Sequence, residues 1–514
     1  MYWTIISWGL LFAVSNVVKS EFYSSVSDLN KLLQTEGIIL KQLDSYIQAQ
    51  EERLGELRRR TLSWKSAHGK ATRNAKDYLL NPVNAFLLIK RLTLEWNDIE
   101  VIANDMAKQD LMNTDDAGKK TLALPERVDL LGAMDALLRL QDVYNLDASA
   151  IANGIGTGSK MLADDCFELG QKLQETGDTH HAADWFREAY DRFDLGKIDL
   201  NKKVKILEYL ASYSYTTGNV EDALDYTDYL LDLQPDNKKA LGQKTFYEDA
   251  IWDQQDKLFK SDKISSSKAS NNILAVYKKL CQGEILRNAS ETSHLRCRYT
   301  STLSAFSKIA PFKIEEINLN PRIVVFHDVL SDTEIDLLKN WSKPLLSRAG
   351  IANQETGKGE VSNYRVSKST WFTDDYHAAI ETITERVEDM TGLSMDTAEE
   401  LQVVNYGLGG QYGPHFDFFH WGELTKSNRI ATVLFYMSDV KVGGATVFPK
   451  LNFALEARKG SAAFWYNLHS SGNLDYSTLH GACPVLIGEK WVANKWIRER
   501  GQEFRRKCDP HDME

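Results

Sequence analysis

A histidine and an aspartate separated by one residue, His415 and Asp417, lie in a stretch of the chain that is rich in glycine. Alternate residues of a β-strand face the same side of a sheet, so an imidazole and a carboxylate would share one space here. Another histidine, His480, follows later in the chain. Two histidines and one carboxylate form the ligand set of non-haem Fe(II) oxygenases, which keep coordination positions open for other ligands. Zinc hydrolases use the same ligand types, so zinc stays an alternative, although the chain has no H-E-x-x-H segment.

A lysine, Lys490, stands ten residues after His480. The even spacing would place both side chains on one face of a continuous strand, with the lysine one site deeper in a barrel. An ammonium group there would pair with the distal carboxylate of 2-oxoglutarate through a charge-assisted hydrogen bond. Lysine suits a narrow pocket because its charge is compact. Each motif is common by chance, but their combination favours an Fe(II) site that uses 2-oxoglutarate.

The chain around these residues has the composition of a β domain. The segments 322–326 and 431–436 are rich in β-branched and aromatic residues, which favour strands. Glycines cluster at 407–410 and again at 443–444. We expect residues 320–514 to form a catalytic domain with an antiparallel double-stranded β-helix, or jelly-roll, fold.

The middle of the chain contains a repeat. Gly177 and Gly218 stand 41 residues apart, and two alanines that follow them have the same spacing. Small residues at such offsets let paired helices cross closely, as in tetratricopeptide repeats. The usual repeat is shorter, so we expect an insertion near residues 193–200. Residues 145–250 are therefore predicted to form a tetratricopeptide-like helical domain; the alternative is a helical hairpin that acts only as a spacer.

Aromatic side chains gather in this repeat, among them Tyr209 and Tyr213. Concave faces of helical repeats bind extended peptides, and aromatic grooves suit proline-rich polyproline II segments. We expect Tyr209 and Tyr213 to bind a proline-rich or collagen-like peptide, while several of the other tyrosines belong to the core.

The N-terminal part reads as helical. Residues 22–60 carry apolar side chains at alternating three- and four-residue steps, the heptad pattern of a coiled coil. We expect residues 21–144 to form a helical dimerisation domain; the alternative is a long amphipathic helix packed on its own domain. Residues 251–319, which begin polar and rich in serine, are predicted to be a linker that contains a disulfide.

The first residues are typical of a secretory signal. The apolar stretch 3–14 precedes small residues near position 20, so residues 1–20 are predicted to be a cleaved signal peptide. A membrane anchor and a buried helix are the alternatives, and no later segment reads as transmembrane. Residues 508–514 lack a Lys-Asp-Glu-Leu-type retention signal, so a partner would have to retain the chain. Two glycosylation sequons, Asn288 and Asn340, fit a secretory route.

The net charge bears on nucleic-acid binding, and the cysteines bear on disulfide pairing. The net charge of −11 argues weakly against nucleic-acid binding. In an oxidising compartment, the five cysteines suggest two pairs and one free thiol. The simplest connectivity of the last four joins neighbours, Cys281 with Cys297 and Cys483 with Cys508.

Taken together, these motifs resemble the α subunits of collagen-type prolyl 4-hydroxylases across nearly the whole chain. The segments that carry the resemblance are 81–86, 137–142, 165–170, 397–402, 409–412, 414–418, 436–439, 443–449, 464–467 and 494–496. The resemblance implies a multidomain α + β protein with an N-terminal dimerisation domain, a peptide-substrate-binding domain and a catalytic domain. It also implies iron at His415, Asp417 and His480, and 2-oxoglutarate at Lys490 with Tyr406 nearby.

The family resemblance further implies the cofactors Fe(II), 2-oxoglutarate, O2 and L-ascorbate. The implied reaction converts peptidyl proline in X-Pro-Gly sequences to 4-hydroxyproline, while 2-oxoglutarate is decarboxylated to succinate and CO2. The implied assembly is an α2β2 tetramer in the lumen of the endoplasmic reticulum, with protein disulfide isomerase as the β subunit. The two neighbouring cysteine pairs match the disulfides of the family.

Two positions depart from the family pattern. Arg498 stands where members often carry a histidine, and Gly413 stands where they often carry a glutamate. Two alternatives remain: a lysyl or non-collagen prolyl hydroxylase on the same scaffold, and a non-catalytic protein that binds proline-rich peptides. The presence of all four site residues argues against the second.

Overall fold

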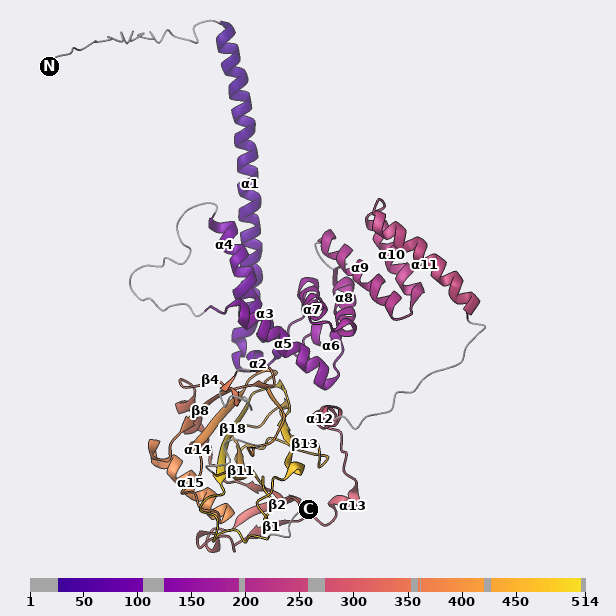
Figure 1. The fold of residues 1–514 in the computed structure, drawn as a ribbon. Helices are drawn as coiled ribbons and strands as arrows, with labels where there is room; N and C mark the ends of the chain where they lie inside the picture. Colours follow the sequence, from indigo (N-terminus) through magenta and orange to yellow (C-terminus); the bar gives the residue numbers. More distant parts are fainter. Residues whose placement is uncertain are drawn as a thin grey trace, which may run out of the picture. The chain divides into compact units, whose positions relative to one another are not determined.

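The computed structural model describes residues 26–104, 124–193, 199–257, 273–352, 359–360, 362–419 and 427–509. The predicted signal peptide lies outside the described residues. The chain divides into two compact units, one of residues 1–73 and 96–120 and the other of residues 74–95 and 121–514. Figure 1 shows the fold and labels many of its helices and strands.

The first unit consists of a long helix and a short one. Helix α1 (Val26–Arg73) has 48 residues, and α4 (Trp96–Asn104) contacts it. The Trp64 and Trp96 rings lie 6.1 Å apart, and Arg53 donates to the carbonyl of Ile102 at 2.9 Å. The apolar heptad side chains are exposed, with fractions between 42% and 66% at Leu33, Leu40, Leu43, Ile47 and Leu54. The helix predicted over 22–60 is therefore present through its described part and continues to residue 73.

The second unit begins with helices. They are α2 (Ala75–Leu79), α3 (Pro82–Lys90), the π-helical turn η1 (Arg91–Glu95), α5 (Arg127–Tyr144), α6 (Ala148–Ala152), α7 (Ala163–Thr176), α8 (Thr179–Phe193), α9 (Leu200–Thr216), α10 (Val220–Leu233), α11 (Lys238–Lys257), α12 (Ile273–Cys281) and α13 (Ala289–Thr292). Among the described helices of the chain, none combines the length and the apolar character that a membrane crossing requires.

The predicted repeat corresponds to helix pairs, α7 with α8 and α9 with α10 (Figure 1). Gly177 ends α7 in a left-handed conformation with φ +83°, and Gly218, with φ +90°, follows α9. The repeated glycines are thus the turns that close the first helix of each pair, where a positive φ favours glycine. At Gly170 the helices approach so closely that a Cβ would lie 2.9 Å from the Phe186 ring. The expected insertion lies mostly outside the described residues.

The rest of the second unit is mainly β. Its strands are β1 (Cys297–Thr300), β2 (Phe312–Asn318), β3 (Ile323–His327), β4 (Ser347–Arg348), β5 (Ile351–Ala352), β6 (Gly359–Glu360), β7 (Arg365–Val366), β8 (Lys368–Phe372), β9 (Leu401–Tyr406), β10 (Gln411–His415), β11 (Arg429–Tyr436), β12 (Val442–Gly443), β13 (Thr446–Phe448), β14 (Phe453–Leu455), β15 (Ala462–Tyr466), β16 (His480–Ala482), β17 (Val485–Ile487) and β18 (Lys490–Arg498). Helices α14 (Asp332–Ser342) and α15 (Ala378–Thr391) and the short 3-10 turns η2 (Phe306–Lys308), η3 (Asp374–Tyr376) and η4 (Tyr476–Thr478) complete it.

Two sheets carry the site. The nine-stranded sheet has the order β1-β2-β3-β15-β11-β18-β9-β8-β4, and the five-stranded sheet has the order β14-β13-β16-β10-β7. In β11, Val433 and Phe435 join a core cluster that includes residues of α14 and α15. Their neighbours Leu434 and Tyr436 join a second cluster, which contains residues of both sheets. Because successive side chains of a strand alternate, the continuous apolar run of β11 reflects burial on both faces.

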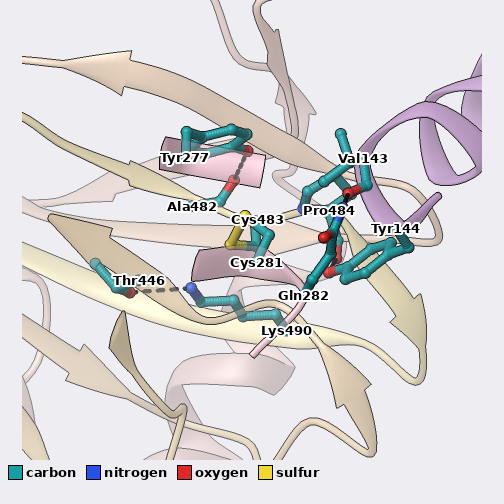
Figure 2. The surroundings of a disulfide bond; sticks show 10 residues. All are labelled: Val143, Tyr144, Tyr277, Cys281, Gln282, Thr446, Ala482, Cys483, Pro484 and Lys490. Atoms are coloured by element: carbon teal, nitrogen blue, oxygen red, sulfur yellow. Dashed lines mark hydrogen bonds between the residues drawn. A yellow bond between two sulfur atoms is a disulfide. The ribbon is translucent and has the colours of Figure 1, made fainter. Parts of the chain in front are cut away.

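The predicted disulfide pairs are wrong. Cys281 is bonded to Cys483, 202 residues away in sequence, with a Cα–Cα distance of 5.6 Å. Cys297 and Cys508 are exposed free thiols. The neighbour rule failed because α12 packs on the small sheet, where Cys281 and Tyr277 share a buried cluster with Val447 and Cys483. Figure 2 shows this environment, in which Tyr277 donates to the carbonyl of Ala482 at 3.2 Å.

The remaining cysteine, Cys166, is free and buried, as the sequence suggested for one thiol. Burial raises its pKa to about 12, so its thiol stays protonated and the residue acts as a small apolar side chain in the helical core.

Candidate active site

The three predicted metal ligands meet at one place in the small sheet. His415 ends β10, His480 begins β16, and the two residues face each other in the antiparallel register. His415 Nε2 lies 3.7 Å from one oxygen of Asp417, and His480 Nε2 lies 3.6 Å from the other. One ligand atom from each residue falls within 4.8 Å of the others. The group can therefore hold a metal ion.

Hydrogen bonds orient both imidazoles for this role. His415 Nδ1 lies 2.8 Å from the carbonyl oxygen of Gly413, and His480 Nδ1 lies 3.0 Å from that of Thr478. A carbonyl only accepts, so each Nδ1 carries the proton and each Nε2 presents a lone pair to the space beside Asp417. Histidine ligands of metals commonly have such a partner behind the ring.

The charges of the group also suit a metal. Burial, together with the nearby His480, lowers the pKa of His415 to about 3, so its ring is neutral. Burial opposes the charge of Asp417, but both histidines, Arg429 and a hydrogen bond hold its pKa below the usual value. That hydrogen bond comes from Thr432 Oγ1 at 2.7 Å. A neutral imidazole and a carboxylate are forms that ligate Fe(II).

Lys490 lies in the same pocket as the three residues. It begins β18 and pairs with Tyr406 of β9. Its side chain is 1% exposed and donates to Thr446 Oγ1 at 3.2 Å (Figure 2). Burial lowers the pKa of its amine to about 7, and no carboxylate of the described residues lies within 4 Å of it. A buried cation without a carboxylate partner is costly, so the pocket favours an anionic ligand.

The reason given for Lys490 from spacing was wrong. His480 belongs to β16 of the small sheet and Lys490 to β18 of the large one, so the two residues do not share a strand face. They meet because the sheets pack against each other across the pocket. Residues that the sequence reading missed also line it, namely Arg365, Tyr412, Thr446, Trp465, Asn494 and Trp496. Tyr412, close to His415 in sequence, was the one with a local signal.

The chain matches three family models. They describe the prolyl 4-hydroxylase α-subunit N-terminal region, over residues 25–158, the prolyl 4-hydroxylase peptide-substrate-binding domain, over 163–253, and the 2OG-Fe(II) oxygenase superfamily, over 401–498. The chain is 40% identical over 538 residues to prolyl 4-hydroxylase subunit alpha-1 of Homo sapiens, with all of both chains covered. The chain belongs to the family of prolyl 4-hydroxylase α subunits.

Two further proteins are similar to this chain. Prolyl 4-hydroxylase subunit alpha-2 of Caenorhabditis elegans is 39% identical over 515 residues, with 97% of this chain and 95% of the relative covered. A solved viral collagen prolyl hydroxylase from Paramecium bursaria Chlorella virus-1 is 28% identical, covers 34% of this chain and 95% of its own, and has a TM-score of 0.29, too low to support an argument. The family confirms the predicted fold class: a helical N-terminal region, a tetratricopeptide-like middle domain and a β-sheet oxygenase domain.

As a member of this family the chain is an Fe(II)- and 2-oxoglutarate-dependent oxygenase. Its two departures from the family pattern have different surroundings. Arg498 forms an ion pair with Glu399 at 2.8 Å and donates to the carbonyl of Ser427 at 2.7 Å, and it shares the carboxylate of Glu399 with Arg429. Gly413 lies under the ring of Tyr364, where a Cβ would be 2.4 Å from a ring carbon.

The two tyrosines predicted to bind peptide lie on α9 of the middle domain and are partly exposed. The Tyr209 ring packs on Phe186, with centroids 4.6 Å apart, and its hydroxyl donates to the carbonyl of Thr179 at 3.3 Å. The Tyr213 hydroxyl lies 2.9 Å from His180 Nδ1. Peptide binding by these two tyrosines stays a prediction.

The predicted sequons lie on exposed positions. Asn288 caps α13 and accepts from the backbone amide of Glu291 at 3.0 Å. Asn340 lies within α14 and accepts from Lys343 at 3.2 Å. Their use as glycosylation sites stays a prediction.

Proposed function

We propose that this chain hydroxylates peptidyl proline at C4 in X-Pro-Gly sequences, as the catalytic subunit of a procollagen-proline 4-dioxygenase. The observation that carries the proposal is the coincidence, in one buried pocket, of a His-Asp-His group and a lysine without a carboxylate partner, in a chain similar to these enzymes over its whole length. Iron held at this site would supply O2 activation coupled to decarboxylation of 2-oxoglutarate to succinate and CO2.

The residues of the pocket divide the work. His415, Asp417 and His480 hold the iron through two Nε2 atoms and a carboxylate oxygen. Thr432 fixes Asp417 by donating to its second oxygen at 2.7 Å, and Asn467 donates to Thr432 Oγ1 at 2.9 Å. Such supporting hydrogen bonds keep ligands in place before the metal arrives.

Lys490 binds the distal carboxylate of 2-oxoglutarate. Tyr406 lies beside Lys490, because the two residues pair across strands β9 and β18. The pKa of Tyr406 is raised to about 12 by burial, so its hydroxyl stays protonated and can donate. Trp465 and Trp496 also line the pocket, where indole rings keep water away from the reacting atoms. L-ascorbate would restore the iron after uncoupled turnover.

The family resemblance also supports proposals for the peptide, the partner and the compartment. We propose that Tyr209 and Tyr213 bind the proline-rich peptide, and that protein disulfide isomerase is the β subunit of an α2β2 tetramer. The exposed apolar stripe of α1 offers a surface for the second α subunit. The disulfide in the structure fits the lumen of the endoplasmic reticulum, where such bonds persist.

The deciding experiment is mass spectrometry of a (Pro-Pro-Gly)-type peptide after incubation with the full chain, Fe(II), 2-oxoglutarate and ascorbate. We expect the peptide to gain one oxygen atom at proline, with succinate formed in equal amount. The matched control is His480→Ala, which lacks one of the three predicted ligands and is compared with the unmodified chain for peptide binding. Oxygen on lysine would indicate a lysyl hydroxylase, and no oxygen transfer with intact peptide binding would indicate a non-catalytic binding protein.

A further inference from the structure

The ring of Tyr364 lies directly over the backbone of Gly413, two residues before the predicted iron ligand His415. A Cβ at Gly413 would lie 2.4 Å from Tyr364 Cε2 and 2.5 Å from Cζ. Gly413 has no positive φ, so its conformation does not require glycine. What requires glycine is space: any side chain at position 413 would displace the phenol ring.

Hydrogen bonds tie Tyr364 to this segment at both ends. Its hydroxyl donates to the carbonyl of Pro414, and its own carbonyl accepts from the amide of Gly413 at 2.9 Å. Tyr364 immediately precedes β7, whose Arg365 pairs with Tyr412 of β10. Tyr364 therefore holds the strand that presents His415 at two points, at Pro414 through its phenol and at Gly413 through its backbone.

The same units support the imidazole of His415. The Gly413 carbonyl accepts from His415 Nδ1 at 2.8 Å, which sets the tautomer. The Tyr412 ring stacks on the His415 ring at 3.5 Å with an angle of 14°. Tyr364 meets that Tyr412 ring edge-on at 6.4 Å and 89°. The hydrogen bond and the ring stacking that hold the His415 imidazole thus come from Gly413 and Tyr412, and Tyr364 contacts both of these residues.

We propose that Tyr364 is a positioning residue for His415 and that Gly413 exists to admit its ring, so the two residues act as one unit. The proposal rests on His415 being an iron ligand. Tyr364 is 44% exposed and belongs to none of the buried core clusters. Replacing Tyr364 removes little core contact. We therefore expect the substitution to lower the affinity for the metal more than the stability of the fold.

The test is a titration of the full, metal-free chain with Co(II) alone, followed by the visible absorption of the bound ion. Gly413→Ala should weaken Co(II) binding about tenfold or more, as loss of supporting groups around metal ligands commonly does. Tyr364→Ala should weaken it to a similar extent. In the double variant the added methyl group meets no ring, so it should bind Co(II) no more weakly than Tyr364→Ala alone.

Tyr364→Phe adds no atoms and removes only the hydroxyl, so it should weaken binding without any clash, even if Gly413→Ala fails to fold. The matched control is Tyr299→Phe, because Tyr299 is 68% exposed on the edge strand β1 and should leave Co(II) binding unchanged. In turnover, the Fe(II) requirement of the variants should rise while the KM for peptide stays constant.

Unchanged Co(II) affinity in Gly413→Ala and in Tyr364→Phe would overturn the proposal. Independent losses that multiply in the double variant would overturn it too, because they would show two separate effects. Failure of the unmodified chain to bind Co(II), or full binding by His415→Ala, would instead overturn the iron assignment on which the proposal rests.

Discussion

The role proposed for Lys490 predicts how much the affinity for 2-oxoglutarate falls when the amine is removed. The amine is buried, has Thr446 as its hydrogen-bond partner, and has a pKa lowered by burial to about 7. The distal carboxylate of 2-oxoglutarate would supply the anion that the pocket lacks. Lys490→Met keeps much of the volume of the side chain and removes the charge.

A hydrogen bond to a charged group contributes about 1.5–3 kcal/mol, and each 1.4 kcal/mol is a tenfold change in affinity. Lys490→Met should therefore raise the Kd for 2-oxoglutarate roughly 10- to 150-fold. The measurement is calorimetric titration of the Co(II)-loaded chain with the keto acid. Co(II) affinity itself should not change, since Lys490 is not one of the three predicted ligands.

The pH dependence provides a second, independent signature. Binding of the carboxylate needs the ammonium form, which is already present below the free-pocket pKa of about 7. Above that pH a proton must be taken up, so the Kd should rise by up to tenfold per pH unit until the pKa of the liganded amine is reached. Lys490→Met should show no such slope.

A stability control separates this effect from misfolding. The folded pKa of Lys490 lies below the usual value of 10.5, so the unfolded chain binds more protons between pH 7 and pH 10.5 and stability rises with pH in that window. Lys490→Met removes the buried amine and should raise the Tm of the ligand-free protein near pH 6. A variant with wild-type affinity and slope for the keto acid would refute the reasoning and move the anchor elsewhere.

The other predictions concern the supports of the site. Thr432→Val should raise the Fe(II) requirement about tenfold by freeing an oxygen of Asp417, and an unchanged metal titration would contradict this. Tyr209→Ala should raise the KM for long proline-rich peptides but not for a single tripeptide unit; equal changes for both would contradict a role in the middle domain. Non-reducing peptide mapping should recover the Cys281 peptide joined to the Cys483 peptide, and a link to another cysteine would contradict the pairing. Without protein disulfide isomerase the chain should aggregate or leave the endoplasmic reticulum, as localisation after expression with and without that partner will show.

Local signals in the sequence predicted the types of the elements and a set of residues that the structure brings together in one pocket. The one-residue separation of His415 and Asp417 predicted that their side chains share one space, and they do, although β10 ends at His415 and Asp417 lies two residues beyond it. The 41-residue spacing of Gly177 and Gly218 predicted helix pairs, because helix ends that need a positive φ favour glycine.

Non-local packing could not be read in the same way. Nothing near Cys281 in sequence indicates that α12 packs on the small sheet, so neighbour pairing was the default and it was wrong. Arg365 reaches the pocket from a short strand that pairs with β10, and no motif marks it. Lys490 does lie in the pocket with the predicted ligands, but the argument for placing it there was wrong. That argument assumed one continuous strand from His480 to Lys490, whereas the two residues belong to different sheets.

That meeting of sheets explains why the site depends on both. The predicted iron ligands belong to the small sheet and the segment just beyond it, whereas Lys490 and Tyr406 belong to the large sheet. Thr446 of the small sheet accepts from Lys490 at 3.2 Å and from the Tyr436 hydroxyl at 3.0 Å, and both donors belong to the large sheet. The distance from the predicted iron site to Lys490 is therefore set by how the sheets pack. Buried polar contacts of this kind fix such packing more specifically than apolar contacts do. A keto acid whose two ends bind different sheets would be selected by its length.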